Sequence, residues 1–285
     1  MPMSGAAPKV LAFGEAMIEF NQASKDRPDY LQGFGGDTSN FCVAAARQGV
    51  SAGYVSALGD DHFGRLLLGM WQAEGVDTSC VRIDPAAPTG VYFVSHGPHG
   101  HAFDYLRAGS AASRYAPRDL PLDAIASARV LHLSGISVAI SSSACDAAFE
   151  AIAHARRHGV QVSFDTNLRL KLWPLARARA VMTEVLRQTH ICLPSWDDVA
   201  VLTGLDNRDA IVDWLLAHGA RVVAAVDATG AGDCFGGAFI ARLVEGDDPF
   251  TAARYANAAA ALSTEGYGAV APIPRRAAVE RALAG

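Results

Sequence analysis

Apolar and polar positions follow two different periods along the first part of the chain. An apolar run at residues 10–13, continued by Met17, Ile18 and Phe20, predicts one strand that begins buried and ends half-exposed. Residues 26–32 are polar and predict a loop. Helices are predicted at 38–48 and 61–74, each followed by a glycine, with a short strand at 54–58 between them.

The remainder of the chain mostly alternates strands with helices. Two apolar stretches at 91–95 and 102–106 flank a Gly-Pro-His-Gly turn and predict a β-hairpin. From residue 124 onward the alternation predicts an α/β fold, with a parallel sheet and helices on both faces, and the hairpin predicts a separate small sheet. The predicted strands are 130–133, 160–164 and 190–193, and the predicted helices are 144–158, 176–188, 206–218 and 231–243.

Composition and charge exclude several classes of protein. Of the 285 residues, 51% are hydrophobic and 19% charged, which is enough to bury a large core. The net charge of −5 argues against a nucleic-acid partner or an anionic membrane surface. No apolar run is long enough to span a membrane, and residues 1–8 have no secretory signal, so we expect a cytoplasmic protein. Without CxxC spacing, the cysteines predict reduced thiols and no zinc site: Cys42, Cys80, Cys145, Cys192 and Cys234.

The most informative segment is Val-Asp-Ala-Thr-Gly-Ala-Gly-Asp at residues 226–233, where a glycine-rich turn opens a predicted helix. Backbone N–H groups around Gly230, Ala231 and Gly232 would form an anion site, aided by the helix dipole. Asp233 lies in the first turn, where its carboxylate would repel a bound phosphate. Its presence is explained if it accepts a proton from a substrate hydroxyl while the N–H groups stabilise the transferred phosphoryl group. An ordinary helix cap is the alternative for Asp233 taken alone.

Aromatic and basic side chains indicate a second ligand-binding region. Gly36 has no Cβ, so a ligand can approach the backbone closely before a predicted helix begins. Tyr92, Tyr105 and Arg107 lie on the predicted hairpin, and the last two share a face because they are two residues apart. Arg169 follows a predicted strand, at the carboxyl end where ligands bind in parallel sheets. A half-exposed hairpin face and a surface arginine are the alternatives without a ligand.

Two sequence signatures, present in the expected order, resemble those of the ribokinase-like (PfkB) carbohydrate kinase family. The first is Gly-Gly-x-x-x-Asn at 35–40, followed by Gly-Asp-Asp-x-Phe-Gly at 59–64. The second is Asp-x-Thr-Gly-Ala-Gly-Asp at 227–233. The resemblance runs from residue 10 to residue 274 and implies one kinase domain at 9–285.

Membership of this family would imply a large α/β domain with a small β-sheet lid over the sugar, formed from residues 15–34 and 89–108. It implies that ATP and Mg²⁺ are used and that exposed lids pair into a homo-oligomer. The resemblance assigns the catalytic base to Asp233. It assigns the anion hole to the N–H groups of the adjoining turn, at Gly230, Ala231 and Gly232.

Within the family the sequence is most similar to the 2-keto-3-deoxygluconate kinases. The residues that would hold the sugar acid are Tyr92, Tyr105, Arg107 and Arg169, with Gly36 beside them. A guanidinium binds a carboxylate in a fork, so two arginines suit a sugar acid better than a neutral sugar. The implied reaction is phosphorylation of the terminal hydroxyl of 2-keto-3-deoxygluconate. A kinase for a neutral sugar such as fructose or ribose, and a non-catalytic regulator that binds sugar or nucleotide, stay open as alternatives.

The resemblance also implies a nucleotide and metal site. Asp198, in a Ser-x-x-Asp sequence where much of the family has Asn-x-x-Glu, would bind Mg²⁺ through water, since this ion keeps waters and needs one or two carboxylates. Asp227 and Thr229 would help to hold a monovalent cation, as in some relatives. The implied nucleotide contacts are Asp165, Asn167, Ser195, Gly230, Gly232 and Asn257, with Gly268 as a looser match.

Three histidines near the hairpin turn raise the question of a metal site. His96, His99 and His101 are close in sequence, but a glycine-proline turn gives no support for convergent ligand geometry. An exposed hairpin tip is the favoured interpretation.

The stretch that precedes the anion turn is unusually short. In the family it holds a further strand and a hairpin that walls the nucleotide site, which would take roughly 15–25 residues. We predict that residues are missing between Val223 and Ala224, as a mobile loop that was not seen. A true deletion, which would put ATP binding in question, is the alternative. A Cα–Cα distance of about 3.8 Å between these residues would contradict the prediction, because it indicates a peptide bond.

Overall fold

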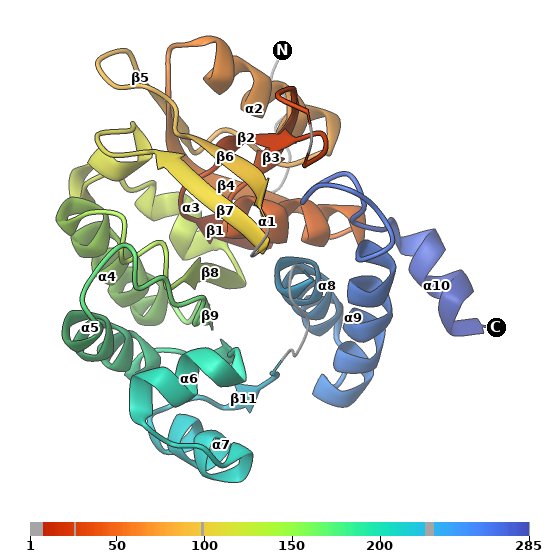
Figure 1. Cartoon of the computed structure of the whole chain (residues 1–285). Coiled ribbons are helices and arrows are strands. Elements are labelled where there is room, and N and C mark those ends of the chain that lie inside the picture. Colours follow the sequence, from red (N-terminus) through yellow and green to blue (C-terminus); the bar gives the residue numbers. More distant parts are fainter. Residues whose placement is uncertain (1–7, 26, 98–99, 226–230, 285) are drawn as a thin grey trace.

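A parallel sheet of seven strands lies at the centre of the computed structural model, which describes residues 8–25, 27–97, 100–225 and 231–284 (Figure 1). The strand order is β11-β10-β9-β8-β1-β4-β5, and every neighbouring pair is parallel. The predicted parallel sheet is therefore confirmed. Its strands are β1 (Val10–Phe13), β4 (Ala52–Gly59), β5 (Val81–Asp84), β8 (Val130–Ser134), β9 (Gln161–Asp165), β10 (Ile191–Leu193) and β11 (Val222–Val223).

Helices cover both faces of this sheet, because side chains along each strand alternate between two buried cores. Val10 and Ala12 of β1 belong to one core, and Leu11 and Phe13 belong to the other. The first core includes α1 (Asp37–Arg47), α2 (His62–Ala73), α8 (Gly232–Glu245), α9 (Pro249–Ser263) and α10 (Arg276–Ala284). The second includes α3 (Leu122–Ser127), α4 (Ser142–Arg157), α5 (Leu175–Arg187), α6 (Trp196–Thr203) and α7 (Arg208–Ala217).

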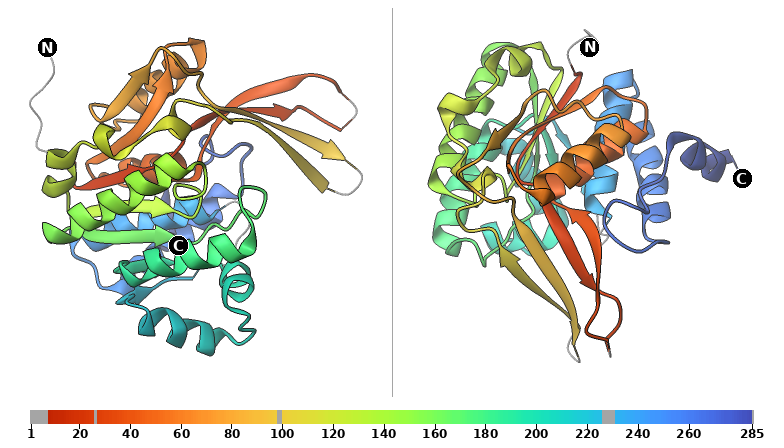
Figure 2. Two further views of the ribbon diagram at one scale, coloured as in Figure 1. Left: turned by 90° about the vertical axis from the view of Figure 1, so that its left-hand side faces the viewer. Right: turned by 90° about the horizontal axis from the view of Figure 1, so that it is seen from above.

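Four further strands form a mixed sheet that projects from the body, here called the lid (Figure 2). Its order is β3-β2-β6-β7. Strands β6 and β7 pair antiparallel, which confirms the predicted hairpin, and β6 pairs parallel with β2. The lid strands are β2 (Met17–Gln22), β3 (Tyr30–Gly35), β6 (Val91–Gly97) and β7 (Gly100–Leu106).

Two expectations for the N-terminal part of the chain are wrong. The single strand expected at 10–20 is two strands, β1 in the large sheet and β2 in the lid. The chain leaves β1 at Gly14, where a Cβ would lie only 2.3 Å from Thr38 Oγ1. Residues 30–32, expected in a loop, begin β3, since pairing with β2 satisfies their backbone although their side chains are exposed.

The junction between Val223 and Ala224 also corrects the sequence analysis. The full sequence has 285 residues, and the structure follows it without interruption here. Val223 pairs with Cys192 of β10, and the Ala224 N–H donates to the Cys192 carbonyl oxygen at 3.0 Å, so the ladder continues across the junction. The prediction of an unseen loop is therefore wrong. Strand β11 is simply short, and the chain soon reaches α8.

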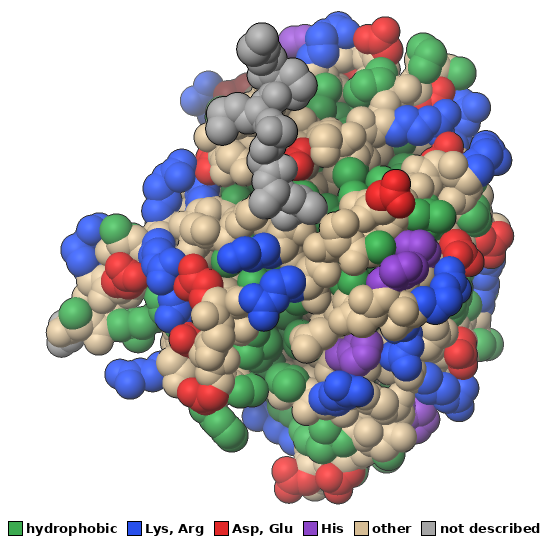
Figure 3. Space-filling view, turned by 180° about the vertical axis from the view of Figure 1, so that it is seen from behind, with side chains coloured by type: hydrophobic (Ala, Val, Ile, Leu, Met, Phe, Trp, Pro, Cys, Tyr) green, Lys and Arg blue, Asp and Glu red, His purple; other side chains and the backbone are tan. Residues whose placement is uncertain are grey.

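The surface and the helices fit the charge balance of the sequence. Seen from behind, basic and acidic side chains are interspersed over the molecule (Figure 3). Across the described residues, no helix combines the length and the apolar character that crossing a membrane requires.

Candidate active site

Close packing of α1 against α8 brings the first turns of these two helices together. A Cβ at Gly237 would lie 2.4 Å from the Phe41 carbonyl oxygen, so only glycine allows this approach. Asn40 then reaches α8, where its Nδ2 donates to Asp233 Oδ2 at 2.9 Å. The two family-like signatures, far apart in sequence, therefore meet at Asp233.

The first turn of α1 carries a second carboxylate, which the sequence analysis did not single out. Asp37 is buried, and its Oδ2 accepts a hydrogen bond from Asn167 Nδ2 at 2.7 Å. Asp37 and Asn40 are three residues apart and so share a helix face. Asn167 has a φ of 23°, which is uncommon outside glycine. Asp37 and Asp233 are thus neighbouring carboxylates, each held by an asparagine.

The surroundings of Asp233 suit a general base. Burial raises the pKa of Asp233 to about 7, and the charge of Asp37 adds to the rise, while the Asn40 hydrogen bond and the Arg169 charge oppose it. A base is most effective when its pKa lies near the working pH. Helix α8 begins at Gly232 with Ala231 as its N-cap, so the first N–H groups of the helix adjoin this carboxylate.

Packing within the protein gives a reason for Gly36 that the sequence analysis did not name. Its φ is 109°, and a Cβ there would lie 2.4 Å from the Glu15 carbonyl oxygen. The close approach of two segments of the protein therefore requires glycine here, and the approach of a ligand to Gly36 stays a prediction.

The two tyrosines of the hairpin face each other across β6 and β7. Their ring centroids are 5.6 Å apart. Tyr92 is buried, and its hydroxyl donates to the Glu19 carboxylate on β2. Burial and Glu19 raise the pKa of Tyr92, and the charge of Asp233 contributes. Tyr92 therefore lies near the candidate base, whereas Tyr105 is more exposed.

The two arginines differ sharply in their surroundings. Arg107, just after β7, is largely buried and its Nη2 forms an ion pair with Glu15 Oε2. Arg169 is exposed and donates to the Leu168 carbonyl oxygen at 3.0 Å; within the described ranges it has no carboxylate partner. Burial raises the pKa of both Tyr105 and Asp233, and the Arg169 charge opposes the rise in each. Arg169 is therefore the cation that faces the base.

The loop after β9 joins the cluster to α6. Asp198 Oδ2 accepts from the Leu168 N–H at 2.9 Å, and the Ser195 N–H donates to Thr166 Oγ1 at 3.1 Å. Burial raises the pKa of Asp165, and the neighbouring carboxylates add to it. Asp165, Asn167, Ser195 and Asp198 are thus brought together at the carboxyl ends of β9 and β10. Among the described residues, no group of three His, Cys, Asp or Glu side chains has the arrangement of a metal site.

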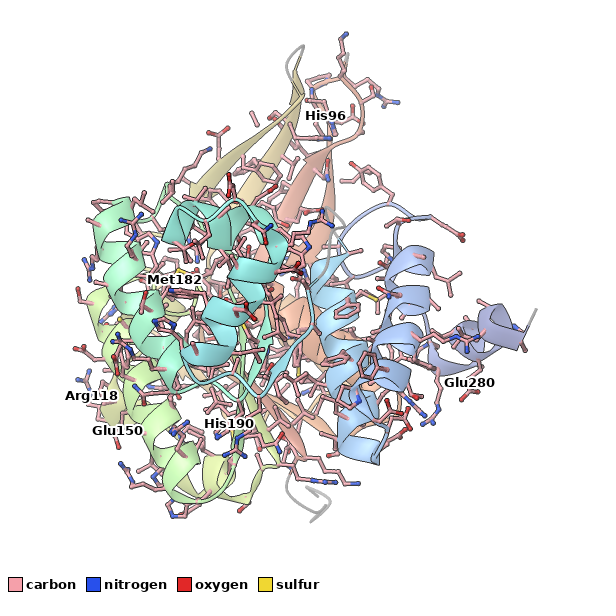
Figure 4. All side chains as sticks on the ribbon, turned by 90° about the horizontal axis from the view of Figure 1, so that it is seen from below. His96, Arg118, Glu150, Met182, His190 and Glu280 are labelled. Carbon is pink, nitrogen blue, oxygen red and sulfur yellow. The ribbon has the colours of Figure 1, made fainter. Side chains whose placement is uncertain are left out.

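The remaining residues named from the sequence are of two kinds, those that the structure describes and those that it does not. Asn257 is exposed on α9, and Gly268 follows that helix in a loop with a φ of 86°. His96 lies far out on the lid (Figure 4), 4.7 Å from His101 between ring centroids, and its Nε2 is 3.0 Å from Asn21 Oδ1. Those that fall outside the described residues are His99, Asp227, Thr229 and Gly230.

Sequence reasoning missed three acidic side chains, Glu15, Glu19 and Asp37, all of which are buried. A carboxylate within an otherwise apolar or small-residue stretch is a signal in itself, because a buried charge needs a partner. The partners, Arg107, Tyr92 and Asn167, come from distant segments, so only the position of the acids could have been read from the sequence.

Comparison with known proteins places the chain in a family. The model of the "pfkB family carbohydrate kinase" matches residues 7–224 and 215–276. The 2-dehydro-3-deoxygluconokinase of Thermoproteus tenax is 36% identical over 94% of this chain and 92% of its own. Probable fructokinase-4 of Arabidopsis thaliana is 30% identical over 99% and 98%. A solved structure, a putative Ribokinase II from E. coli in complex with ATP and Mg²⁺, has a TM-score of 0.89 and 26% identity over 97% and 99%.

The same comparisons show that the family match is interrupted near β11. The family model matches in two pieces that meet at residues 215–224. The alignment with the T. tenax kinase has 304 positions, yet 94% of 285 residues is about 268, so about 36 positions have no counterpart in this chain. Relatives are therefore longer, and the break in the match lies beside β11. With its ribokinase-like parallel sheet and lid, its two signatures and these relatives, the chain belongs to the pfkB family and is a carbohydrate kinase.

Proposed function

We propose that this kinase transfers a phosphoryl group from ATP to the terminal hydroxyl of a sugar acid, with 2-keto-3-deoxygluconate as the substrate and its 6-phosphate as the product. One observation carries the proposal: the candidate base Asp233 lies near Arg169, a cation without a carboxylate partner in the part of the chain that the structure describes. The acceptor hydroxyl requires the base, and a sugar carboxylate requires the cation. The T. tenax relative is named for the same substrate.

The residues around Asp233 account for the chemical step. Asp233 takes the proton from the acceptor hydroxyl as its oxygen bonds to the γ-phosphorus of ATP. The bond from that phosphorus to the bridging oxygen breaks, and ADP leaves with the electron pair. Asn40 holds Asp233 through Oδ2, and Oδ1, which has no hydrogen bond to the described residues, takes the proton. The N–H groups at the start of α8 stabilise the charge on the transferred phosphoryl group.

The residues on the nucleotide side fit a magnesium ion. Asp165 and Asp198 supply two carboxylates, and Mg²⁺ commonly binds through one or two carboxylates and several waters. When bound, the ion neutralises charge on the phosphates. Asp198 would hold it through water, and Asn167, Ser195 and Asn257 would contact the nucleotide. A monovalent cation at Asp227 and Thr229 is a further part of this proposal.

A neutral sugar is the second candidate substrate. Fructokinase-4 of A. thaliana is 30% identical over 99% of this chain, a broader match than that of the sugar-acid kinase. In addition, the charge of Arg107 is compensated by Glu15, so one cation rather than two remains for a carboxylate.

An ADP-release assay over a panel of sugar acids and neutral sugars tests the proposal. We expect the kcat/KM for 2-keto-3-deoxygluconate to exceed that for fructose and ribose by about tenfold or more. A preference for fructose or ribose would establish the neutral-sugar alternative. Absence of ADP release with every sugar, at high ATP and Mg²⁺, would establish a non-catalytic binding protein.

Pairing of lids into a homo-oligomer, in the cytoplasm, completes the proposal. Strand β7 is an edge of the lid sheet and all its residues are exposed, including Phe103 and Leu106. An exposed apolar edge favours pairing with another strand. Light scattering of the purified protein should give the mass of a dimer or a larger species, and a monomer at micromolar concentration would contradict this part.

A further inference from the structure

The chain crosses between the body and the lid four times, and Glu15 contacts or forms every crossing. Glu15 itself connects β1 to β2, and its carbonyl oxygen lies against Gly36, which connects β3 to α1. Before β6, a Cβ at Gly90 would lie 2.9 Å from Glu15 Oε1. After β7, Ser110 Oγ donates to Glu15 Oε1 at 2.6 Å, and Arg107 pairs with Oε2. This one carboxylate therefore lies at the hinge between the two sheets.

The charges of Glu15 and Arg107 compensate each other. Glu15 is 1% exposed, and burial raises its pKa, while the Arg107 charge and the Ser110 hydroxyl oppose the rise. A carboxylate in such a place stays ionised only beside a cation, which makes Arg107 its obligatory partner. The positive charge of Arg107 is accordingly neutralised by the Glu15 carboxylate and not by a ligand.

Most of the Arg107 guanidinium is also out of reach of a ligand. Its Nη2 atom is buried against the Glu15 carboxylate, and its Nε atom is buried without solvent contact and has no hydrogen-bond acceptor among the described residues. The guanidinium carbon lies 5.7 Å from the centroid of the Tyr105 ring, and that ring stacks on Tyr92. Arg107 thus links the hinge to Tyr105 and, through the stacked rings, to Tyr92 near the base. Arg169, by contrast, is exposed.

We infer that Glu15 is a positioning residue of the sugar site: it holds Arg107 at the hinge beneath Tyr105 and cancels its charge, so that Arg169 alone selects sugar acids over neutral sugars. This inference rests on the proposed function and deepens it. It assigns different roles to Arg107 and Arg169, which the sequence analysis treats as equivalent.

The test compares the double variant Glu15→Gln/Arg107→Gln, which removes both charges of the pair, with Arg169→Gln, which removes one unpaired charge. The readout is the kcat/KM for 2-keto-3-deoxygluconate divided by that for fructose, supported by the Kd of the sugar acid from calorimetry. In the double variant we expect kcat to fall for both sugars while the ratio stays within about threefold of the wild type. In Arg169→Gln the ratio should fall by about tenfold or more, and the sugar acid should bind correspondingly more weakly.

A double variant whose ratio falls as far as that of Arg169→Gln would overturn the inference, because Arg107 would then read the carboxylate. If the double variant does not fold, the single variant Glu15→Gln provides the test instead. It frees the Arg107 charge, so the Kd of the sugar acid should fall by about twofold to fivefold while the KM for fructose is unchanged. Loss of affinity for both sugars would indicate a merely structural role. A wild-type enzyme that rejects sugar acids would overturn the proposed function itself, independently of the variants.

Discussion

The sugar side and the nucleotide side of the candidate site differ in how completely their residues are buried and paired. On the sugar side, each buried or half-buried acid has a defined partner: Asn40 for Asp233, Asn167 for Asp37, Tyr92 for Glu19 and Arg107 for Glu15. On the nucleotide side, β11 has two residues, and Asn257 is exposed on α9. The T. tenax relative has about 36 aligned positions that this chain lacks, and the family match breaks beside β11.

This difference predicts high specificity for the sugar and low specificity for the phosphoryl donor. Partnered buried acids fix the geometry of the base and the lid, because moving any one of them leaves a charge or a donor unsatisfied. A short strand at the edge of a sheet offers little surface against which a nucleotide base can be buried. We therefore expect this enzyme to discriminate well between sugars and poorly between phosphoryl donors.

Loss of the base would have the largest effect on the sugar side. In Asp233→Asn, kcat should fall by about 10²–10⁴ while sugar and ATP still bind, because a positioned base is lost but the shape of the site is kept. Steady-state kinetics and calorimetry measure the two quantities. Asp197→Asn, at an exposed carboxylate on α6, is the matched control and should stay near the wild type. A kcat for Asp233→Asn above a tenth of normal would disprove the base assignment.

The two arginines offer the next largest effect, this time on stability. Arg107→Ala leaves Glu15 buried without a cation, which should cost about 3–5 kcal/mol of unfolding free energy. Arg169→Ala removes an exposed side chain without a carboxylate partner in the described residues and should change stability by about 0.5 kcal/mol or less. Denaturant unfolding of both variants measures the contrast.

The double variant Glu15→Gln/Arg107→Ala is the control for this contrast. It removes the uncompensated carboxylate and should recover part of the loss seen in Arg107→Ala. Equal destabilisation by Arg107→Ala and Arg169→Ala would mean that the Glu15 pair does not stabilise the hinge.

Donor binding tests the other half of the comparison. We expect ATP to bind with a Kd of about 1 mM or weaker, and GTP to bind within about threefold of it, since β11 is an edge strand of two residues and offers little surface to recognise the base. Calorimetric titration of ATP and GTP, each with Mg²⁺, gives both constants. Micromolar binding of ATP with much weaker binding of GTP would show that the nucleotide side is complete despite its shorter chain.

Much of the fold followed from local pattern, because strand and helix periods depend on neighbouring residues. The helices at α1, α4 and α5 and the hairpin β6–β7 were predicted close to their observed bounds. Helix α9 was not predicted, since its alanine-rich sequence has weak periodic contrast. The division of the first apolar run into β1 and β2 was missed because it depends on Thr38, which lies against Gly14 only in the folded chain.

The site was predictable to the extent that its residues lie in short motifs. Asp233 and Arg169 follow from a glycine-rich turn and the end of a strand, and the structure brings both into one cluster. The pairing of Arg107 with Glu15 was not predictable, because 92 positions separate the two residues and only the four crossings of the hinge bring them together. An arginine in a motif therefore does not reveal whether its charge is available to a ligand.

The smallest effect concerns the pH dependence of the sugar side. Burial and the charge of Asp37 raise the pKa of Asp233 to about 7, and the base acts only when it is deprotonated. Activity should therefore be full above that pKa and fall as pH drops below it, by about tenfold for each further unit. Asp37→Asn removes a negative charge that favours protonation of Asp233, so its pKa should fall and the acidic limb of the kcat profile should move to lower pH. Asp197→Asn, distant from Asp233 along the chain and exposed, should leave the limb in place. If the acidic limb stays in place in Asp37→Asn, or moves to higher pH, the charge of Asp37 does not raise the pKa of Asp233. The partnered acids of the sugar side would then titrate independently of one another.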